Sequence, residues 1–166
     1  MKPLTVAIAG NPNSGKTTLF NLLTGSRQKV GNWPGVTVEK KTGTCNISGE
    51  VVNIVDLPGI YSFSAASPDE QIARDFLLSK SADVVVNILD ATSMERGLFL
   101  TMQLLEMGIP VIVAANMMDR VKELNLQLDI KGLSHELNCP VLQMTASKQQ
   151  GIADLKSLLG EVSREP

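Results

Sequence analysis

A segment near the start of the chain has the residue types and spacing of a phosphate-binding loop. Residues 10–17 read GNPNSGKT and match the pattern G-x-x-x-x-G-K-[ST]. The glycines of such a loop let the backbone wrap around the phosphates of a nucleotide, with several N–H groups pointing inward. Lys16 can reach the β and γ phosphate oxygens, and the hydroxyl of Thr17 is the expected Mg²⁺ ligand. The segment therefore predicts a site for a nucleoside triphosphate.

A second motif, D-x-x-G, occupies residues 56–59, directly after the apolar run 51–55. In a nucleotide site the carboxylate of Asp56 can hold Mg²⁺ through a water molecule, and the N–H of Gly59 can contact the γ-phosphate. The motif alone is a common turn. Its position after an apolar strand, and after the phosphate loop in the chain, is what favours a phosphate site.

Residues 116–119, NMMD, resemble the N-K-x-D motif with which GTPases bind guanine. Asp119 would accept hydrogen bonds from the guanine N1–H and exocyclic amine, which adenine lacks, so adenine would leave this carboxylate unpaired. Asn116 would orient the loop. Met117 replaces the usual lysine and keeps an apolar stem to lie over the base. Residues 145–147, TAS, resemble the last base-contacting loop, in which the N–H of Ala146 would contact the guanine O6.

The elements that must position these motifs are short apolar runs that alternate with segments of helical periodicity. The runs predict strands at residues 4–9, 51–55, 84–89, 111–115 and 141–144, and the periodicity predicts helices at 18–23, 67–77, 95–107, 130–137 and 152–162. This alternation predicts a three-layer α/β/α sandwich of the P-loop NTPase type around a mostly parallel sheet. Residues 37–47 reach the run 51–55 through only three residues, too few for a crossover, so they are expected to form one antiparallel edge strand of a six-stranded sheet.

The composition restricts the class of protein. The 166 residues suit one α/β domain, and 43% apolar with 19% charged residues is typical of a globular chain. A net charge of −2 argues against a nucleic-acid partner, which would require a basic excess. Cys45 and Cys139 are not at metal-ligand spacing. The apolar runs are far shorter than the ~20 residues of a membrane span, so the chain as given is expected to be soluble.

The motifs together resemble the Ras-like, TRAFAC class of GTPases, and a narrower resemblance covers nearly the whole chain. Residues 10–21, 30–39, 56–62 and 116–119 resemble the N-terminal G domain of the FeoB ferrous-iron transporters. The resemblance implies that residues 1–166 are a single GTP-binding domain excised from a larger membrane transporter, at the cytoplasmic face of the bacterial inner membrane. It implies slow, Mg²⁺-dependent and K⁺-stimulated GTP hydrolysis to GDP that is coupled to Fe²⁺ uptake. The implied partners are a helical domain that inhibits GDP release, a membrane permease domain and other copies of the full-length transporter.

The resemblance also implies roles for individual residues. Thr37 would complete the Mg²⁺ coordination, although the residues by themselves do not decide between Thr37 and Thr42. Asn13 would hold K⁺ against the phosphates with backbone carbonyls of residues 31–33, in the place of an arginine finger. The expected catalytic residues are Lys16, Asn13, Gly59 and Thr37, and the expected metal ligands are Thr17, Thr37 and Asp56 for Mg²⁺ and Asn13 for K⁺. The expected nucleotide contacts are Asn11, Pro12, Asn13, Ser14, Gly15, Lys16, Thr17, Thr18, Asp56, Gly59, Asn116, Met117, Asp119, Thr145, Ala146 and Ser147.

Three further positions bear on the mechanism. Ile60 stands where many Ras-like proteins have a glutamine that orients the attacking water, and its side chain has no donor or acceptor. We therefore expect backbone groups to position the water. Trp33 lies in a glycine- and proline-rich segment and is expected on a mobile surface loop rather than in the core. Residues 67–70, SPDE, match a capping box, and Asp69 is assigned to capping the helix that starts near Ser67.

Two other functions remain open from the sequence. The first is a regulatory switch whose slow hydrolysis merely times a contact with a transporter. The second is a soluble GTPase that associates with the ribosome or tRNA, although the basic domain that such proteins carry is not part of this chain. A nucleotide kinase is disfavoured because it would have no use for the guanine motif at residues 116–119.

Overall fold

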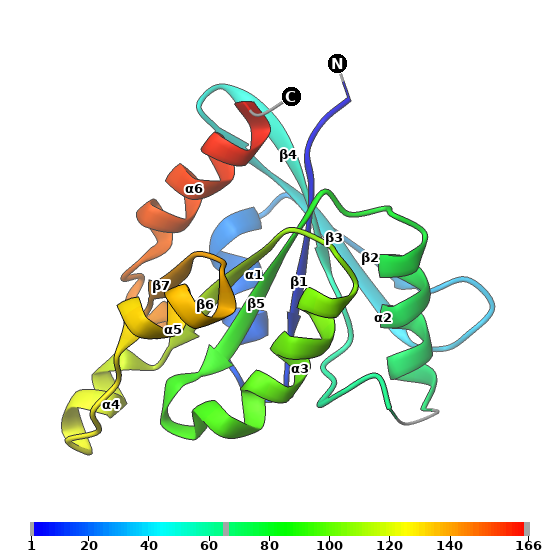
Figure 1. Cartoon of the computed structure of the whole chain (residues 1–166). Coiled ribbons are helices and arrows are strands. Elements are labelled where there is room, and N and C mark those ends of the chain that lie inside the picture. The colour runs from blue at the N-terminus through cyan, green and yellow to red at the C-terminus, as the bar shows by residue number, and fades with distance from the viewer. Residues whose placement is uncertain (1, 65–66, 165–166) are drawn as a thin grey trace.

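A single mixed β-sheet forms the centre of the molecule (Figure 1). The structure is a computed structural model, and it describes residues 2–64 and 67–164. Its strands are β1 Thr5–Gly10, β2 Gln28–Asn32, β3 Glu39–Ile47, β4 Glu50–Asp56, β5 Val84–Asp90, β6 Val111–Asn116 and β7 Val141–Gln143. Its helices are α1 Lys16–Thr24, α2 Pro68–Leu78, α3 Met94–Glu106, α4 Met118–Glu123, α5 Ile130–Leu137 and α6 Ile152–Arg164, with short 3₁₀ turns η1 Ala91–Ser93 and η2 Ala146–Lys148. The strand order is β2-β3-β4-β1-β5-β6-β7.

Helices cover both faces of the sheet, as predicted for a three-layer α/β/α sandwich (Figure 1). In β1, Val6 and Ile8 pack with buried residues of α1 and α6, whereas Ala7 and Ala9 pack with buried residues of α2 and α3. A strand that is covered on both faces needs apolar residues on both, which explains its continuous apolar run. The β1, β4, β5, β6 and β7 strands pair in parallel and fulfil the prediction of a mostly parallel sheet.

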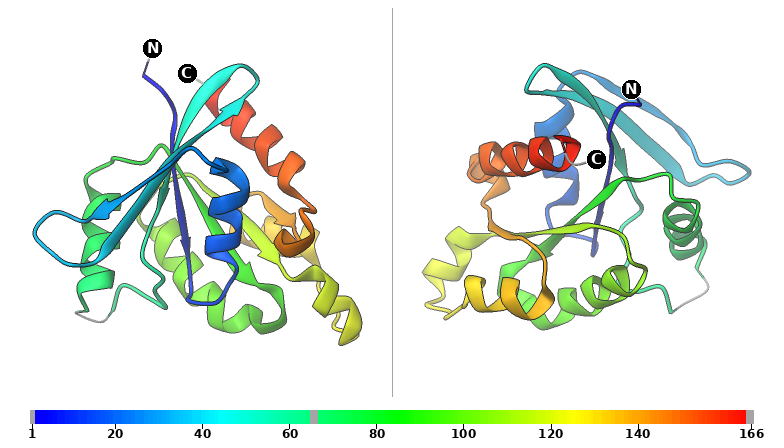
Figure 2. Two further views of the ribbon diagram at one scale, coloured as in Figure 1. Left: turned by 180° about the vertical axis from the view of Figure 1, so that it is seen from behind. Right: turned by 45° about the horizontal axis from the view of Figure 1, so that its top comes forward.

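The sheet differs from the prediction at its edge. Residues 2–64 and 67–164 contain seven strands instead of six, because β2 pairs antiparallel with β3 and forms the outer strand. β3 is antiparallel to β4, as expected, but it is not the edge, and it begins at Glu39 instead of residue 37. The β2–β3 hairpin projects beyond the rest of the sheet (Figure 2). β2 was missed because it has no apolar alternation, and its one large apolar residue, Val30, is 65% exposed.

The ends of the helices follow from local chemistry. α2 begins as the capping box predicts, because the Ser67 hydroxyl accepts a hydrogen bond from the Glu70 N–H at 3.2 Å and Pro68 occupies the first helical position. After α3, Gly108 adopts a φ of 76°, a left-handed conformation that ends a helix and that glycine adopts without strain. The longest helices are α3 and α6, with 13 residues each. Among the described residues, no helix has the length and apolar character needed to cross a membrane.

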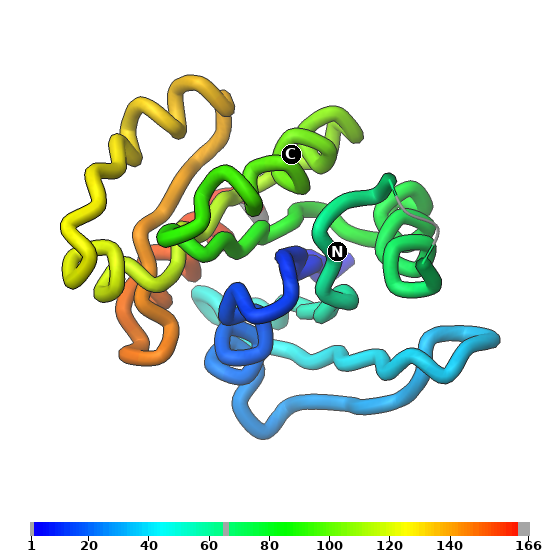
Figure 3. The backbone as a smooth tube through the Cα atoms, turned by 90° about the horizontal axis from the view of Figure 1, so that it is seen from below, coloured from blue at the N-terminus to red at the C-terminus, as the bar shows by residue number. Residues whose placement is uncertain are grey.

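The carboxyl ends of the parallel strands meet at one edge of the molecule, which Figure 3 views from below. The segments that follow β1, β4, β6 and β7 are therefore neighbours in space. Backbone hydrogen bonds join the segments after β4 and β7 to the neighbouring strands: Leu57 N–H donates to Ile8 C=O of β1 at 3.1 Å, and Met144 N–H donates to Ala115 C=O of β6 at 2.8 Å. This edge holds the sequence motifs with predicted chemistry, as ligand sites in open α/β sheets generally do.

Truncation of a buried side chain on α1 tests the layer that supports the phosphate loop. Phe20 is 0% exposed and packs against the sheet. We expect Phe20→Ala to lower the free energy of unfolding by about 3–5 kcal/mol, because it leaves a cavity in a packed core. Phe99→Ala is the control, since Phe99 is 57% exposed, and a change within about 0.5 kcal/mol is expected there. Urea unfolding measures both, and equal losses would contradict the described packing.

Candidate nucleotide-binding site

The phosphate loop lines a cavity of about 570 Å³ at the carboxyl edge of the sheet. The lining residues come from the loop, from the start of α1, from the segment after β4, from the first turn of α2 and from the loop after β6. They are Pro12, Asn13, Gly15, Lys16, Thr17, Thr18, Gly59, Asp69 and Met117. All of them except Asp69 were predicted as nucleotide contacts. Asp69 was missed because its position in the first turn of α2 was explained by capping alone, and only the fold brings that turn to the cavity.

Two glycines of the site lie at close approaches of other groups. Gly15 has a φ of 99°, and a Cβ there would lie 2.2 Å from Nδ2 of Asn116. At Gly59 a Cβ would lie 3.3 Å from the Pro12 Cα, so any side chain would press on the phosphate loop. These contacts let the phosphate loop, the D-x-x-G segment and the loop after β6 approach one another closely.

The side chain of Asn116 joins three of the predicted loops. Its Nδ2 donates a hydrogen bond to the Ser14 carbonyl at 3.0 Å, and its Oδ1 accepts one from the Ala146 N–H at 2.9 Å. Asn116 is 3% exposed, so both hydrogen bonds are shielded from water. A buried amide that satisfies two backbone groups fixes the relative position of the loops that carry them. This geometry supports the predicted role of Asn116 in orienting the base loop.

Asp119 lies beyond Asn116, at the start of α4. Its Oδ1 accepts a hydrogen bond from the Arg120 N–H at 2.9 Å, and its Oδ2 lies 3.4 Å from Nζ of Lys148. Asp119, Thr145 and Lys148 border a separate cavity of about 790 Å³ beside α4. Lys148 was not predicted, because an ion pair across two loops leaves no signal in sequence spacing.

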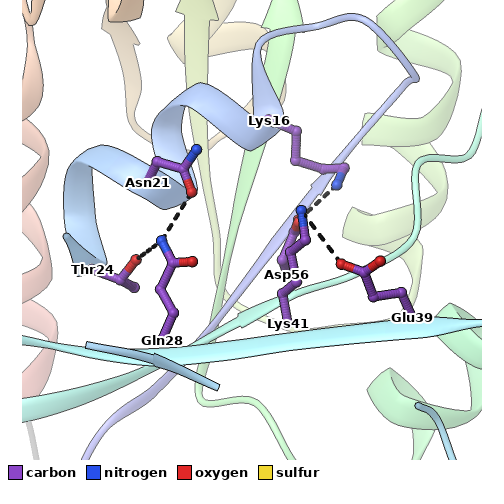
Figure 4. Close-up of polar contacts among 7 residues, drawn as sticks. All are labelled: Lys16, Asn21, Thr24, Gln28, Glu39, Lys41 and Asp56. Carbon is purple, nitrogen blue, oxygen red and sulfur yellow. Dashed lines mark hydrogen bonds and ion pairs between the residues drawn. The ribbon is translucent and has the colours of Figure 1, made fainter. Parts of the chain in front are cut away.

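Lys16 and Asp56 form a direct ion pair at the predicted phosphate site (Figure 4). The Nζ–Oδ1 distance is 2.6 Å, and the side chains are 11% and 8% exposed. Burial raises the pKa of Asp56 above its usual value, and the charge and hydrogen bond of Lys16 oppose this rise. The hydroxyl of Thr17 and the carboxylate of Asp56 are hard oxygen donors, which is the set that Mg²⁺ prefers. The donor chemistry therefore fits a Mg²⁺ ion at this place.

Not every predicted contact lies in the phosphate cavity. Oδ1 of Asn11 and Oγ of Ser14 are buried and have no hydrogen-bond partner in the described part of the chain. Neither residue lines the cavity, and their contacts with a nucleotide stay predictions. Ser147 is exposed in η2, next to Ala146.

The two candidate threonines for Mg²⁺ lie in different surroundings. Thr42 is part of β3, where it pairs with Val55 and Lys29, and it lines another cavity beside α2. Its position is fixed by the ladder, which argues against a role at the phosphates. Thr37 lies in the exposed segment between β2 and β3 and does not line the phosphate cavity. Its part in Mg²⁺ coordination stays a prediction, and so does that of residues 31–33 in holding K⁺.

The expectation that Trp33 lies on an exposed loop is wrong. Trp33 is 5% exposed and packs edge-on against Phe76 of α2, with ring centroids 5.6 Å apart. Nζ of Lys40 lies 4.7 Å from the centroid of the Trp33 ring, within cation–π range. The β2–β3 hairpin folds over α2 and brings these residues together, a long-range contact that a glycine-rich local sequence does not reveal.

The side chain of Ile60 points into the core. It is 3% exposed, and its N–H donates to the Gly10 carbonyl at 3.1 Å. The apolar side chain is therefore a packing element, in agreement with the expectation that it orients no water.

Burial raises the pKa of the Cys45 and Cys139 thiols above the usual value. Within residues 2–64 and 67–164, no group of three or more His, Cys, Asp or Glu residues is arranged to hold a metal ion.

Comparisons with known proteins agree with these motifs. The sequence model of the family described as "Ferrous iron transport protein B" matches residues 4–159. The Fe(2+) transporter FeoB of Escherichia coli (strain K12) is 53% identical over 160 residues, which are 94% of this chain but only 21% of that protein. The chain thus spans about a fifth of the length of the curated relatives it matches.

Solved structures give the same result. A mutant of S. thermophilus NFeoB bound to GDP is 48% identical, with a TM-score of 0.92 over 96% of this chain and 61% of that one. The cytosolic domain of the T. maritima FeoB iron transporter in a GMPPNP form is 42% identical, with a TM-score of 0.94 over 98% of this chain and 64% of that one. The three-layer fold and its mixed sheet are therefore those of this family.

Removal of the Asn116 side chain tests its role as the link between loops. Asn116→Ala would leave the Ser14 carbonyl and the Ala146 N–H buried without partners, so we expect the free energy of unfolding to fall by about 2–4 kcal/mol. Asn46→Ala is the matched control, because Asn46 is exposed on β3 and should change stability by no more than about 0.5 kcal/mol. Urea unfolding measures the free energy of unfolding of both variants, and similar losses in the two would contradict this role of Asn116.

Proposed function

The chain belongs to the ferrous iron transport protein B family, and we propose that it is the Mg²⁺-dependent, K⁺-stimulated GTP-hydrolysing domain of an Fe²⁺ transporter. The observation that carries this proposal is the cavity at which the phosphate loop, Gly59 of the D-x-x-G motif and Met117 of the guanine motif meet. The relatives support it, since the solved S. thermophilus and T. maritima structures contain GDP and GMPPNP, and the E. coli relative is named an Fe(2+) transporter.

The phosphates would be held by the backbone of residues 10–17 and by the amino-terminal end of α1. N–H groups converge there, and the dipole of the helix favours an anion. Lys16 is the side chain that reaches the phosphates. Because its Nζ already contacts Asp56 at 2.6 Å, phosphate oxygens would compete with Asp56 for the same charge. The ammonium group of Lys16 could therefore move from the Asp56 carboxylate to the phosphates when a nucleotide binds.

Guanine would be selected by Asp119. Its carboxylate lies at the start of α4, and Asn116 fixes the loop before it. The carboxylate can accept from the N1–H and the exocyclic amine of guanine, whereas adenine would leave it unpaired. Met117 adopts a left-handed conformation with φ 65° and lines the phosphate cavity, so its side chain can lie beside the base and ribose.

Four side chains would hold the metal ions. Thr17 and Asp56 provide oxygen donors for Mg²⁺, and Asn13, exposed and lining the cavity, provides a carbonyl oxygen for K⁺. When bound, the two ions supply positive charge that offsets the negative charge developing on the transferred phosphoryl group. We assign Thr37 to the same Mg²⁺ ion after movement of the exposed segment between β2 and β3.

The attacking water would be positioned by backbone groups. Ile60 is buried and has no polar atom in its side chain, so the N–H of Gly59 and neighbouring backbone groups are the available partners. Backbone groups give weaker orientation than a dedicated side chain, and we infer slow hydrolysis. A slow regulatory switch is therefore the second candidate function, and the rate in K⁺ separates the two.

The whole protein would extend beyond this chain, because the E. coli relative has nearly five times its length. We propose that residues 1–166 are one G domain, placed at the cytoplasmic face of the bacterial inner membrane. A helical domain that slows GDP release and a membrane permease domain would complete the protein, and the nucleotide state would control Fe²⁺ uptake. Membership of this family gives no support to a ribosome- or tRNA-associated GTPase.

Potassium dependence tests the catalytic role of Asn13. We expect GTP hydrolysis to be at least about tenfold faster in K⁺ than in Na⁺ at equal ionic strength, because K⁺ adds positive charge where the transition state develops negative charge. Asn13→Ala should abolish this difference, whereas Asn46→Ala should keep it. Phosphate release measures the rates, and equal rates in the two salts would refute K⁺ stimulation.

Base selectivity tests the role of Asp119. The unmodified chain should bind GDP at least about a hundredfold more tightly than ADP, and Asp119→Ala should remove most of this preference. Asp154→Ala is the control, since Asp154 is exposed on α6. Titration with fluorescent GDP and ADP gives the affinities. Equal affinities for the two nucleotides, unchanged in Asp119→Ala, would contradict guanine recognition.

A further inference from the structure

Two long side chains from different helices hold the backbone of one residue in the segment 57–64, which follows β4. The N–H of Phe63 donates a hydrogen bond to Oε1 of Gln103 on α3, at 2.8 Å. The carbonyl of Phe63 accepts one from the guanidinium of Arg74 on α2. Both backbone groups of Phe63 are thus satisfied by side chains distant in the sequence. The segment passes between α2 and α3 on its way from β4 (Figure 1).

The other end of the same segment is fixed to the strand before the phosphate loop. The N–H of Leu57 donates to the Ile8 carbonyl and that of Ile60 to the Gly10 carbonyl, each at 3.1 Å. The side chains of Ile60 and Phe63 are 3% and 8% exposed. The segment that carries Gly59 is therefore fixed at both ends, with the exposed Tyr61 between them.

Gln103 is well placed to act as the fixed point. Its neighbour Leu104 and the preceding Leu100 are 0% exposed and pack α3 against the sheet, so the helix is a rigid support. Both polar atoms of the Gln103 amide form hydrogen bonds, because Nε2 also donates to Oγ of Ser64 at 3.3 Å. Oxygen and nitrogen of one side chain thus bind two consecutive residues of the segment.

We propose that Gln103 is a positioning residue for GTP hydrolysis: by holding Phe63, it sets the place of the Gly59 and Ile60 backbone at the phosphate cavity. The inference rests on the proposed function. Its physical reason is that Ile60 offers no polar side chain, so the backbone must orient the water, and a backbone group is effective only when it is held in place before reaction. Gln103 supplies that restraint from a helix packed on the sheet, with Arg74 as its counterpart on α2.

The test compares two substitutions at residue 103 in this 166-residue chain. Gln103→Met keeps the length of the side chain but removes both hydrogen bonds, whereas Gln103→Glu keeps an oxygen that accepts from the Phe63 N–H. Gln71→Met is the matched control, because Gln71 is exposed on α2. The measured quantities are kcat and KM for GTP, the affinity for GDP, the thermal midpoint and the hydrogen exchange of the Phe63 amide.

We expect Gln103→Met to lower kcat at least about tenfold while KM and the GDP affinity stay within about twofold, since displacement of positioned groups slows chemistry more than binding. Exchange of the Phe63 amide should rise in the same variant. Gln103→Glu should restore kcat to within about threefold and should restore amide protection, which loss of packing alone would not predict. Gln71→Met should match the unmodified chain.

Three results would overturn the proposal. The first is an unchanged kcat in Gln103→Met, whatever the exchange rate. The second is a Gln103→Glu variant as slow as Gln103→Met. The third is unchanged exchange of the Phe63 amide in Gln103→Met. If the unmodified chain hydrolyses no GTP, the proposed function itself fails. Hydrogen exchange of the Phe63 amide then tests alone whether Gln103 holds the segment. Faster exchange in Gln103→Met would support that role, and unchanged exchange would refute it.

Discussion

The buried side chain of Asn116 is the contact on which the arrangement of the site depends. It binds the Ser14 carbonyl on one side and the Ala146 N–H on the other, and so joins the loops after β1, β6 and β7. A single amide, shielded from water, links these loops with two directed bonds. Gly15 has to be a glycine for the same reason, because the Asn116 amide occupies the space beside it.

The charges of Lys16 and Asp56 at the site are paired with each other. Lys16 and Asp56 are both nearly buried, and either charge alone would be poorly solvated there. Their contact holds both side chains in place. In the proposed function, Lys16 would exchange Asp56 for phosphate and Asp56 would exchange Lys16 for Mg²⁺, so each charge would keep an opposite partner. The strand order makes the pair possible, because β4 lies directly beside β1.

The segment after β4 shows how a site can lack a polar catalytic side chain and still be ordered. Ile60 contributes apolar packing directly after Gly59 of the D-x-x-G motif. Order comes from the backbone of the segment, which is bound to β1 at one end and to α2 and α3 at the other. The position of the segment is therefore linked to the helices that cover this face of the sheet.

The sequence alone determined the features that depend on short spacing. The phosphate loop, the D-x-x-G and guanine motifs, the parallel strands and the cap of α2 at Ser67 could all be predicted, because each is set by residues within one turn or one strand. The three-layer sandwich followed from the alternation of these elements. Most of the phosphate cavity was predicted with them, since the carboxyl ends of parallel strands must share one edge.

Tertiary structure alone decided the features that depend on residues far apart in the chain. β2 is a strand because it pairs with β3 and because Gln28 binds Asn21 and Thr24 of α1, as Figure 4 shows. Trp33 is buried because the hairpin meets α2, and Gln103 reaches Phe63 across 40 positions. Such contacts have no local period or spacing. Their partners are chosen by the packing of whole elements, and only the folded chain brings them within bonding distance.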